Sequence, residues 1–130
     1  MEIKKTILVV EDEKSLREAI VSILVATKYK TLEAKNGIEG VEIALSKHPD
    51  MILLDLIMPE MDGMTALKKI REDVWGKNVP VIILTNVSAT SEQLVEDMVT
   101  HKPLNYLIKS DWKLRDISDK IKKVFETETT

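Results

Sequence analysis

The sequence contains no cysteine, so disulfide bonds, thiolate metal sites and a cysteine nucleophile are all excluded. It also lacks long hydrophobic runs, and the run near its beginning, Ile7–Val10, is far too short for a signal peptide or a membrane span. An excess of positive charge is missing as well. The formal net charge is −3, whereas a broad nucleic-acid-binding surface needs clustered lysine and arginine. We therefore predict a cytoplasmic protein that contacts neither nucleic acid nor a membrane.

The length and composition are those of a single globular domain. A chain of 130 residues can bury one hydrophobic core but is hardly long enough for two. Hydrophobic residues make up 44% and charged residues 32%, which is ordinary for a globular protein. No internal repeat, low-complexity tract or linker is evident in the sequence. We predict one domain over residues 1–126 and a flexible tail over residues 127–130.

Short apolar runs alternate with segments of helical periodicity along the whole chain. The predicted strands are Thr6–Val10, Thr31–Ala34, Met51–Asp55, Val81–Leu84 and Tyr106–Ile108. The predicted helices have inner faces spanning Leu16–Leu24, Ile38–Leu45, Leu67–Val74, Leu94–Val99 and Leu114–Val124, with Asn36 capping the second and Pro103 ending the fourth. Strict alternation predicts parallel strands joined by right-handed crossovers, with helices on both faces of the sheet. The fold class is therefore a doubly wound α/β domain.

Polar residues that can carry chemistry stand at the ends of four predicted strands. They are Glu11-Asp12, Asp55, Thr85 and Lys109, after the first, third, fourth and fifth strands respectively. In an open parallel sheet these ends share one edge, which is where ligands bind. Crowded carboxylates repel one another unless a cation neutralises them, and oxygen ligands without histidine or cysteine suit Mg²⁺. With a hydroxyl and an ammonium nearby, the edge is predicted to be a metal-assisted phosphoryl site.

Each of these residues also has a simpler interpretation. Acidic residues after a strand often favour the beginning of the next helix, as the acids at residues 11–13 could. Thr85 alone would be an ordinary strand-end residue, and Lys109 alone a solvated charge. Asp62-Gly63 is better explained as a turn and helix start than as part of a site. The joint occurrence at four strand ends favours the site.

Four motifs carry a resemblance to a known family. They are VVEDE at residues 9–13, LLDLIMPEMDG at residues 53–63, ILT at residues 83–85 and YLIK at residues 106–109. With them, the whole chain resembles the receiver domain of two-component response regulators, and its length is similar to that of the single-domain chemotaxis regulators. The resemblance implies a flavodoxin-like sheet of five strands in the order 2-1-3-4-5, with five helices.

The resemblance also implies a role for each residue at the strand ends. It makes Asp55 the phospho-acceptor. The implied Mg²⁺ ligands are Asp12 directly, Glu11 through water, Asp55 itself and the backbone carbonyl of Ile57. Thr85 and Lys109 are implied to hold the phosphoryl oxygens, and Tyr106 to be the aromatic switch residue. Pro59 and Gly63 are expected to shape the loop beside Asp55.

The implied partners follow from this function. The phosphoryl donor would be a histidine kinase or a histidine phosphotransfer protein. Phosphorylation would alter the surface formed by residues 94–99, the fifth strand and the segment after Trp112. This surface would dock a downstream target or a separate output domain, or form a phosphorylation-dependent homodimer. The chain is accordingly expected to be a stand-alone regulator or a piece of a longer one.

Three positions depart from the pattern of the family. Asn86 follows Thr85 where the family more often has alanine or serine, which predicts narrower access for the phosphoryl group. Ser110 replaces the proline that commonly follows the lysine, so a cis peptide is not implied there. Ile57 is apolar at a position facing the attacking water, which predicts slower hydrolysis of the acyl phosphate.

Three other classes of protein compete with a phospho-accepting switch. A phosphatase of the haloacid dehalogenase type needs a second acid two residues after the strand-end aspartate, and that position is Ile57. A flavin-binding domain needs a phosphate loop rich in serine, threonine and glycine, where this chain has acids that would repel phosphate. A degenerate receiver acting only as a scaffold would usually lack a reacting group. We therefore predict a switch that is not an enzyme, and keep the scaffold and the phosphatase as alternatives.

Overall fold

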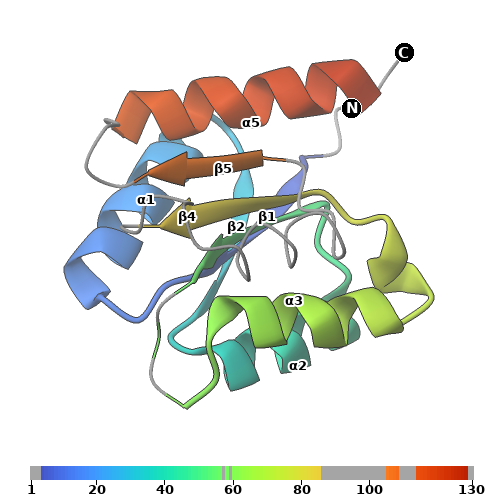
Figure 1. Cartoon of the computed structure of the whole chain (residues 1–130). Helices are drawn as coiled ribbons and strands as arrows, with labels where there is room; N and C mark the ends of the chain where they lie inside the picture. Colours follow the sequence, from blue (N-terminus) through green and yellow to red (C-terminus); the bar gives the residue numbers. More distant parts are fainter. Residues whose placement is uncertain (1–3, 57, 59, 86–104, 109–113, 129–130) are drawn as a thin grey trace.

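A five-stranded parallel sheet lies between two layers of helices in the computed structural model, which describes residues 4–56, 58, 60–85, 105–108 and 114–128 (Figure 1). The elements in chain order are β1 (Thr6–Val10), α1 (Lys14–Ala26), β2 (Lys30–Ala34), α2 (Gly37–Lys47), β3 (Met51–Asp55), α3 (Gly63–Glu72), the 3-10 helix η1 (Trp75–Lys77), β4 (Val81–Thr85), β5 (Asn105–Ile108) and α5 (Leu114–Glu128). The strand order is β2-β1-β3-β4-β5 and every pair is parallel. The predicted α/β class and sheet order are thus confirmed.

The structure leaves one predicted helix untested and extends the last helix beyond its predicted end. Four α-helices lie in the part of the chain that is described, and the helix predicted over Leu94–Val99 falls outside it, as does Pro103. At the carboxyl-terminal end, α5 continues to Glu128, whereas we expected a flexible tail from residue 127. The sequence pattern gave no turn residue that would end the helix earlier.

The strands β1, β3 and β4 are buried on both faces because helices cover both faces of the sheet, whereas β2 at the edge is partly exposed. Successive side chains of a strand point to opposite faces, so Ile7 and Val9 join one core cluster while Leu8 and Val10 join the other. The first cluster includes residues of α1 and α5, and the second includes residues of α2 and α3. Full burial of each such side chain stabilises the fold by about 1.5–3 kcal/mol. A strand covered on both faces needs apolar side chains at consecutive positions, which explains the continuous apolar runs in the sequence.

Side-chain caps begin the two helices that pack on the same face of the sheet, α2 and α3 (Figure 1). The Asn36 carboxamide oxygen accepts a hydrogen bond of 2.8 Å from the backbone N–H of Glu39, as the predicted cap requires. The Asp62 carboxylate accepts one of 2.8 Å from the backbone N–H of Thr65. Asp62-Gly63 is therefore a helix start, which confirms the simpler interpretation of this pair.

Two residues assigned to inner helix faces are exposed instead. Val74 is 83% exposed because α3 ends at Glu72 and the backbone of Asp73 is extended, which turns the chain away from the sheet. Ile38 is 40% exposed, since α2 approaches the sheet through small residues. A Cβ at Gly40 would lie 2.9 Å from a methyl of Val10, so the helix approaches closely only with glycine at this position.

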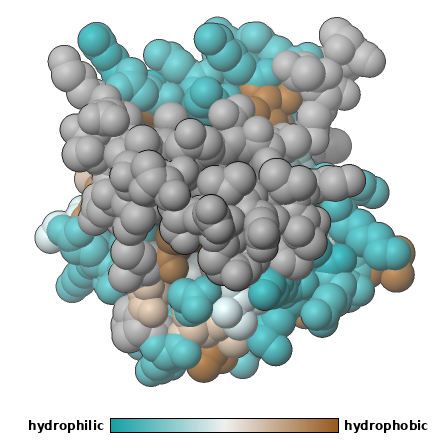
Figure 2. Space-filling model, in the orientation of Figure 1, coloured by the Kyte–Doolittle hydropathy of each residue, from teal (hydrophilic) through white to brown (hydrophobic). Residues whose placement is uncertain are grey.

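The outer surface of the described helices is mostly polar, although Val25 on α1 is 57% exposed. In the space-filling view, the side of the molecule where α5 lies is mostly hydrophilic (Figure 2). Beneath it, the Phe125 ring contacts the Tyr29 ring at a centroid distance of 5.7 Å, which attaches α5 to the connection before β2. Burial, and then the charge of Glu126, raise the pKa of Tyr29. None of the helices in the described ranges is both long and apolar enough to cross a membrane.

Candidate functional site

Three carboxylates meet at the carboxyl edge of the sheet. Val10 pairs with Leu54 across β1 and β3, so Glu11 and Asp55 come one residue beyond that pair. One carboxylate oxygen from each of Glu11, Asp12 and Asp55 lies within 4.8 Å of the other two. Glu11 is completely buried, Asp55 is 3% exposed, and Asp12 faces solvent. The described residues thus bring together three of the four predicted Mg²⁺ ligands.

Hydrogen bonds hold the two buried acids in place. The backbone N–H of Glu11 donates to the carbonyl of Ala34 on β2 at 3.0 Å. The Glu11 carboxylate bends back over the turn, where its Oε2 atom accepts a hydrogen bond of 3.1 Å from the backbone N–H of Glu13. Asp55 pairs with Leu84 in the sheet. The carbonyl of Leu84 also accepts a hydrogen bond of 3.2 Å from the backbone N–H of Leu56. Backbone hydrogen bonds to neighbouring strands therefore continue to Glu11 and Leu56 at this edge.

The simpler interpretation of the acids, as helix-starting residues, holds in part. Glu13 occupies the position that caps α1, yet in the described structure its own side chain makes no capping hydrogen bond. The Glu11 carboxylate does accept a backbone N–H of the turn, as already noted. Asp12 is exposed and belongs to the carboxylate cluster. Local helix capping alone therefore does not explain why these acids converge with Asp55.

The loop after β3 returns to the site through Gly63. The backbone N–H of Gly63 donates to the carbonyl of Leu56 at 2.8 Å. A Cβ at this position would overlap the carbonyl oxygen of Asp55 and lie 2.8 Å from the Cα of Leu56. Only glycine permits α3 to begin this close to the strand end. Within the same loop, Glu60 has a φ of 68°, in the left-handed region.

The remaining predicted site residues are described only in part. Thr85 ends β4, one residue after Leu84, the partner of Asp55, and its backbone pairs with Ile108. Tyr106 lies in β5 and pairs with Ile83, but the side chains of Thr85 and Tyr106 are not among those described. Lys109 and Ile57 lie outside the described residues, as do Pro59, Asn86 and Ser110. The roles of all these residues therefore remain predictions.

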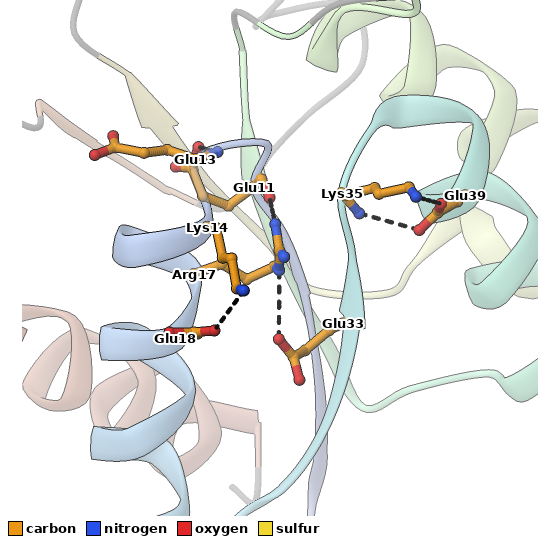
Figure 3. A network of polar contacts seen from close by, with 8 residues as sticks. All are labelled: Glu11, Glu13, Lys14, Arg17, Glu18, Glu33, Lys35 and Glu39. Carbon is orange, nitrogen blue, oxygen red and sulfur yellow. Dashed lines mark hydrogen bonds and ion pairs between the residues drawn. The ribbon is translucent and has the colours of Figure 1, made fainter.

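Arg17 on α1 contacts the site and was missed by the sequence analysis. Its Nη1 atom donates to the backbone carbonyl of Glu11 at 2.8 Å, and its Nε atom donates to the Glu33 carboxylate on β2 at 3.3 Å (Figure 3). A signal was available in the sequence. Arg17 follows Glu13 by four residues, so one helical turn places it over the acidic segment.

The chemistry of the cluster favours a hard cation. Three carboxylates within 4.8 Å repel one another, and two of them are buried, where a charge is stable only when it is paired or coordinates a metal. Oxygen ligands of this kind fit Mg²⁺, which takes one or two carboxylates and keeps several waters. Glu11, Asp12 and Asp55 are the residues that could hold the ion. A carboxylate beside a bound cation is also placed to receive an electrophilic phosphorus.

Comparison with known proteins agrees with this geometry. The response regulator receiver domain family matches residues 7–122 of the chain. A protein-glutamate methylesterase/protein-glutamine glutaminase of Archaeoglobus fulgidus is 37% identical over 113 residues, which are 86% of this chain and 32% of that protein. The response regulator DivK of Brucella ovis is 31% identical over 62% of this chain and 66% of its own length. The chain spans only 6% to 38% of the length of several other curated relatives.

Solved structures share the fold. A receiver domain protein of Methanospirillum hungatei superimposes with a TM-score of 0.88 over 98% of both chains, at 22% identity. The receiver domain of a sensor histidine kinase of Pseudomonas aeruginosa has a TM-score of 0.82 and 27% identity, covering 93% of this chain and 97% of its own. That structure contains a magnesium ion coordinated in its active site cleft. The family match, the sheet order and the acidic edge lead to one conclusion: this chain belongs to the response regulator receiver domains of two-component signalling systems.

Proposed function

We propose that Asp55 accepts a phosphoryl group from a phosphohistidine, with Mg²⁺ held by Glu11, Asp12 and Asp55. The observation that carries this proposal is the buried Asp55 carboxylate beside two others at the carboxyl edge of the sheet. The magnesium ion in the Pseudomonas receiver, at 27% identity, supports the choice of metal. The donor would be a histidine kinase or a histidine phosphotransfer protein.

The transfer exchanges one bond to phosphorus for another. An oxygen of the Asp55 carboxylate attacks the phosphorus, the phosphorus–nitrogen bond breaks, and the imidazole of the donor leaves with a proton from solvent. When bound, Mg²⁺ neutralises charge on the phosphoryl oxygens. The sheet edge keeps the Asp55 carboxylate in position, because its neighbours Leu54 and Leu56 are buried and Leu56 is bonded to β4. The backbone carbonyl of Ile57 would be a further ligand of the ion.

Phosphorylation with a small donor tests the acceptor. Wild-type protein incubated with acetyl phosphate and Mg²⁺ should gain the mass of one phosphoryl group, and Asp55→Asn should gain none. Asp62→Asn is the matched control, because Asn is an equally good helix cap and the substitution removes a nearby carboxylate outside the cluster. The control should be phosphorylated like the wild type. A full adduct on folded Asp55→Asn would refute the assignment.

Thr85, Lys109 and Tyr106 are proposed to read the phosphorylated state. The new group brings roughly two negative charges and several strong acceptors to Asp55. Thr85, at the end of the adjacent strand, would donate its hydroxyl hydrogen, and Lys109 would pair with the phosphoryl oxygens. The movement of Thr85 would leave room that Tyr106 fills by turning inward, where its ring gains from burial. Two states separated by a few kcal/mol would then exchange populations.

The coupling can be followed with a phosphoryl mimic. Beryllofluoride and Mg²⁺ should shift the NMR signals of Asp55 and also those of Tyr106 and α5 in the wild type. In Thr85→Ala, the mimic should still bind while the changes at Tyr106 become much smaller. Thr65→Ala, a loss of hydroxyl on α3, serves as the control. Equal changes around Tyr106 in wild type and Thr85→Ala would contradict this coupling.

The partners and setting of the chain follow from the same proposal. The surface of residues 94–99, β5 and α5 would dock a downstream target or a separate output domain, or would form a phosphorylation-dependent dimer. The domain would act in the cytoplasm as a phospho-acceptor rather than as a turnover enzyme. The match to the Archaeoglobus methylesterase covers 32% of that protein, so its esterase activity is not carried over.

A further inference from the structure

The side chain of Arg17 is held in one place although it lies near the surface of α1. It is 15% exposed, whereas Lys14, one turn earlier on the same helix, is 78% exposed. Its Nε atom lies 3.3 Å from a carboxylate oxygen of Glu33 on β2, and its Nη1 atom lies 2.8 Å from the carbonyl oxygen of Glu11 (Figure 3). The planar guanidinium suits two acceptors at fixed angles, which an ammonium does not match.

Arg17 binds the acidic segment on both sides of Asp12. Its side chain donates to the carbonyl of Glu11, and its backbone N–H donates to the carbonyl of Glu13 at 2.9 Å. The Glu11 carboxylate in turn accepts the N–H of Glu13 at 3.1 Å. The peptide unit between Glu11 and Asp12 is therefore attached to the Arg17 side chain, and the one between Glu13 and Lys14 to the Arg17 backbone through the first hydrogen bond of α1. The exposed Asp12 carboxylate lies between these two attachments, with an oxygen within 4.8 Å of the Asp55 carboxylate.

The hydrogen bond from Arg17 to the Glu11 carbonyl opposes the electrostatic repulsion among the three carboxylates. Glu11, Asp12 and Asp55 place three oxygens within 4.8 Å, and like charges at this distance push the segment away from β3. Glu11 is fixed by its burial, but Asp12 lies on an exposed turn that could relax toward solvent. A charge-assisted hydrogen bond from Arg17 resists that movement, and the ion pair with Glu33 ties the guanidinium to the sheet.

We propose that Arg17 is a positioning residue for the Mg²⁺ site, which it serves by holding the turn that carries Glu11 and Asp12. This inference rests on the metal site of the proposed function. Arg17 is not one of the proposed ligands, and its side chain bonds the Glu11 carbonyl and the Glu33 carboxylate. It acts through the backbone, in the way that residues outside a metal's own ligands orient those ligands. Glu33 shares the role, because it holds the other side of the guanidinium.

Magnesium titration of substituted proteins tests the role of Arg17. We expect Arg17→Met to weaken Mg²⁺ binding roughly tenfold in calorimetric titrations of folded protein, as loss of an orienting partner does at other metal sites. Arg17→Lys should recover only part of the affinity, because one ammonium cannot span both acceptors. Lys14→Gln is the charge control. It removes a positive charge close to the acids but breaks only the exposed pair with Glu18, so the affinity should change less than about twofold.

Two further variants separate positioning from general stability. Ile70→Val trims a buried side chain on α3 and should lower the melting temperature without changing Mg²⁺ affinity. Glu33→Gln keeps Arg17 but loosens it, and should weaken Mg²⁺ binding by a smaller factor than Arg17→Met does. It also serves as the test if Arg17→Met does not fold. If both Arg17→Met and Glu33→Gln bind Mg²⁺ like the wild type, the positioning role is wrong.

The outcome also separates this inference from the proposed function. Unchanged affinity in the Arg17 and Glu33 variants, with binding lost in Asp12→Ala, would refute the positioning role and leave the metal site intact. Equal weakening in Arg17→Met and Lys14→Gln would refute it as well, since charge alone would then explain the effect. If Asp12→Ala binds Mg²⁺ as the wild type does, the metal site itself is wrong, and the role of Arg17 fails with it.

Discussion

Asp12→Ala is expected to abolish both Mg²⁺ binding and phosphorylation while making the protein more stable to heat. Asp12 supplies one of three clustered carboxylates and is the one that faces solvent, where an ion can reach it. The loss should exceed the 10–100-fold typical of residues that only support a ligand, so phosphorylation by acetyl phosphate should fall by more than about a hundredfold. Removal of one of three like charges relieves repulsion in the metal-free protein, which should raise the melting temperature by a few degrees.

Glu13→Gln is the matched control for Asp12→Ala. Glu13 is exposed and adjacent in sequence, but it is not part of the carboxylate cluster, and its backbone contacts do not depend on its charge. It should leave Mg²⁺ affinity and phosphorylation close to those of the wild type. Mass spectrometry after acetyl phosphate treatment and a thermal melt measure both effects. An undiminished rate of phosphorylation of the wild type in excess chelator would contradict the role of the metal.

Gly63→Ala is expected to lower the free energy of unfolding by about 3 kcal/mol, because a methyl group there meets backbone rather than a movable side chain. The added Cβ would overlap the Asp55 carbonyl oxygen and press on the Cα of Leu56. Either α3 must move outward or the end of β3 must shift. A shift at Asp55 would also weaken Mg²⁺ binding. Denaturant titration gives the stability change, and calorimetry gives the affinity.

Whether Gly63→Ala lowers or raises the free energy of unfolding shows whether the beginning of α3 lies against the end of β3. Alanine is the better helix former by about 0.5–1 kcal/mol, so without the overlap the substitution would leave the protein equally stable or more stable. Lys68→Ala on the exposed face of the same helix is the control, and it should change stability by less than about 0.5 kcal/mol. A stabilised Gly63→Ala protein with normal Mg²⁺ affinity would show that the loop does not approach β3 as closely as described.

The sheet could be predicted from the sequence because its signal is local and strong. Apolar runs such as Ile7–Val10 and Met51–Leu54 have no polar side, so they fit only strands that are covered on both faces. Alternation of strands and helices then restricts the connections to right-handed crossovers. The edge that carries Glu11, Asp12 and Asp55 follows, because parallel strands all end on the same side.

Helix faces were predicted less well, because periodicity does not say how closely a helix approaches the sheet. Ile38 was expected inside, yet the small residues Gly37, Gly40 and Ala44 form the buried stripe of α2. Val74 was expected to continue α3, but the chain leaves the helix at Asp73, whose carboxylate accepts the N–H of Trp75 at 2.9 Å. Both outcomes depend on contacts with other elements, which a local pattern does not contain.

The sequence by itself determined that Glu11, Asp12 and Asp55 lie at one edge of the sheet, since parallel strands all end on the same side. The tertiary structure decided how they differ: Glu11 is buried and Asp12 is exposed, although both are acids and adjacent in the chain. It also decided that the Arg17 side chain donates to the Glu11 carbonyl and that any side chain at position 63 would overlap the Asp55 carbonyl. The physical reason is that each of these contacts involves a backbone carbonyl of another element, and backbone carbonyls are the same in every residue.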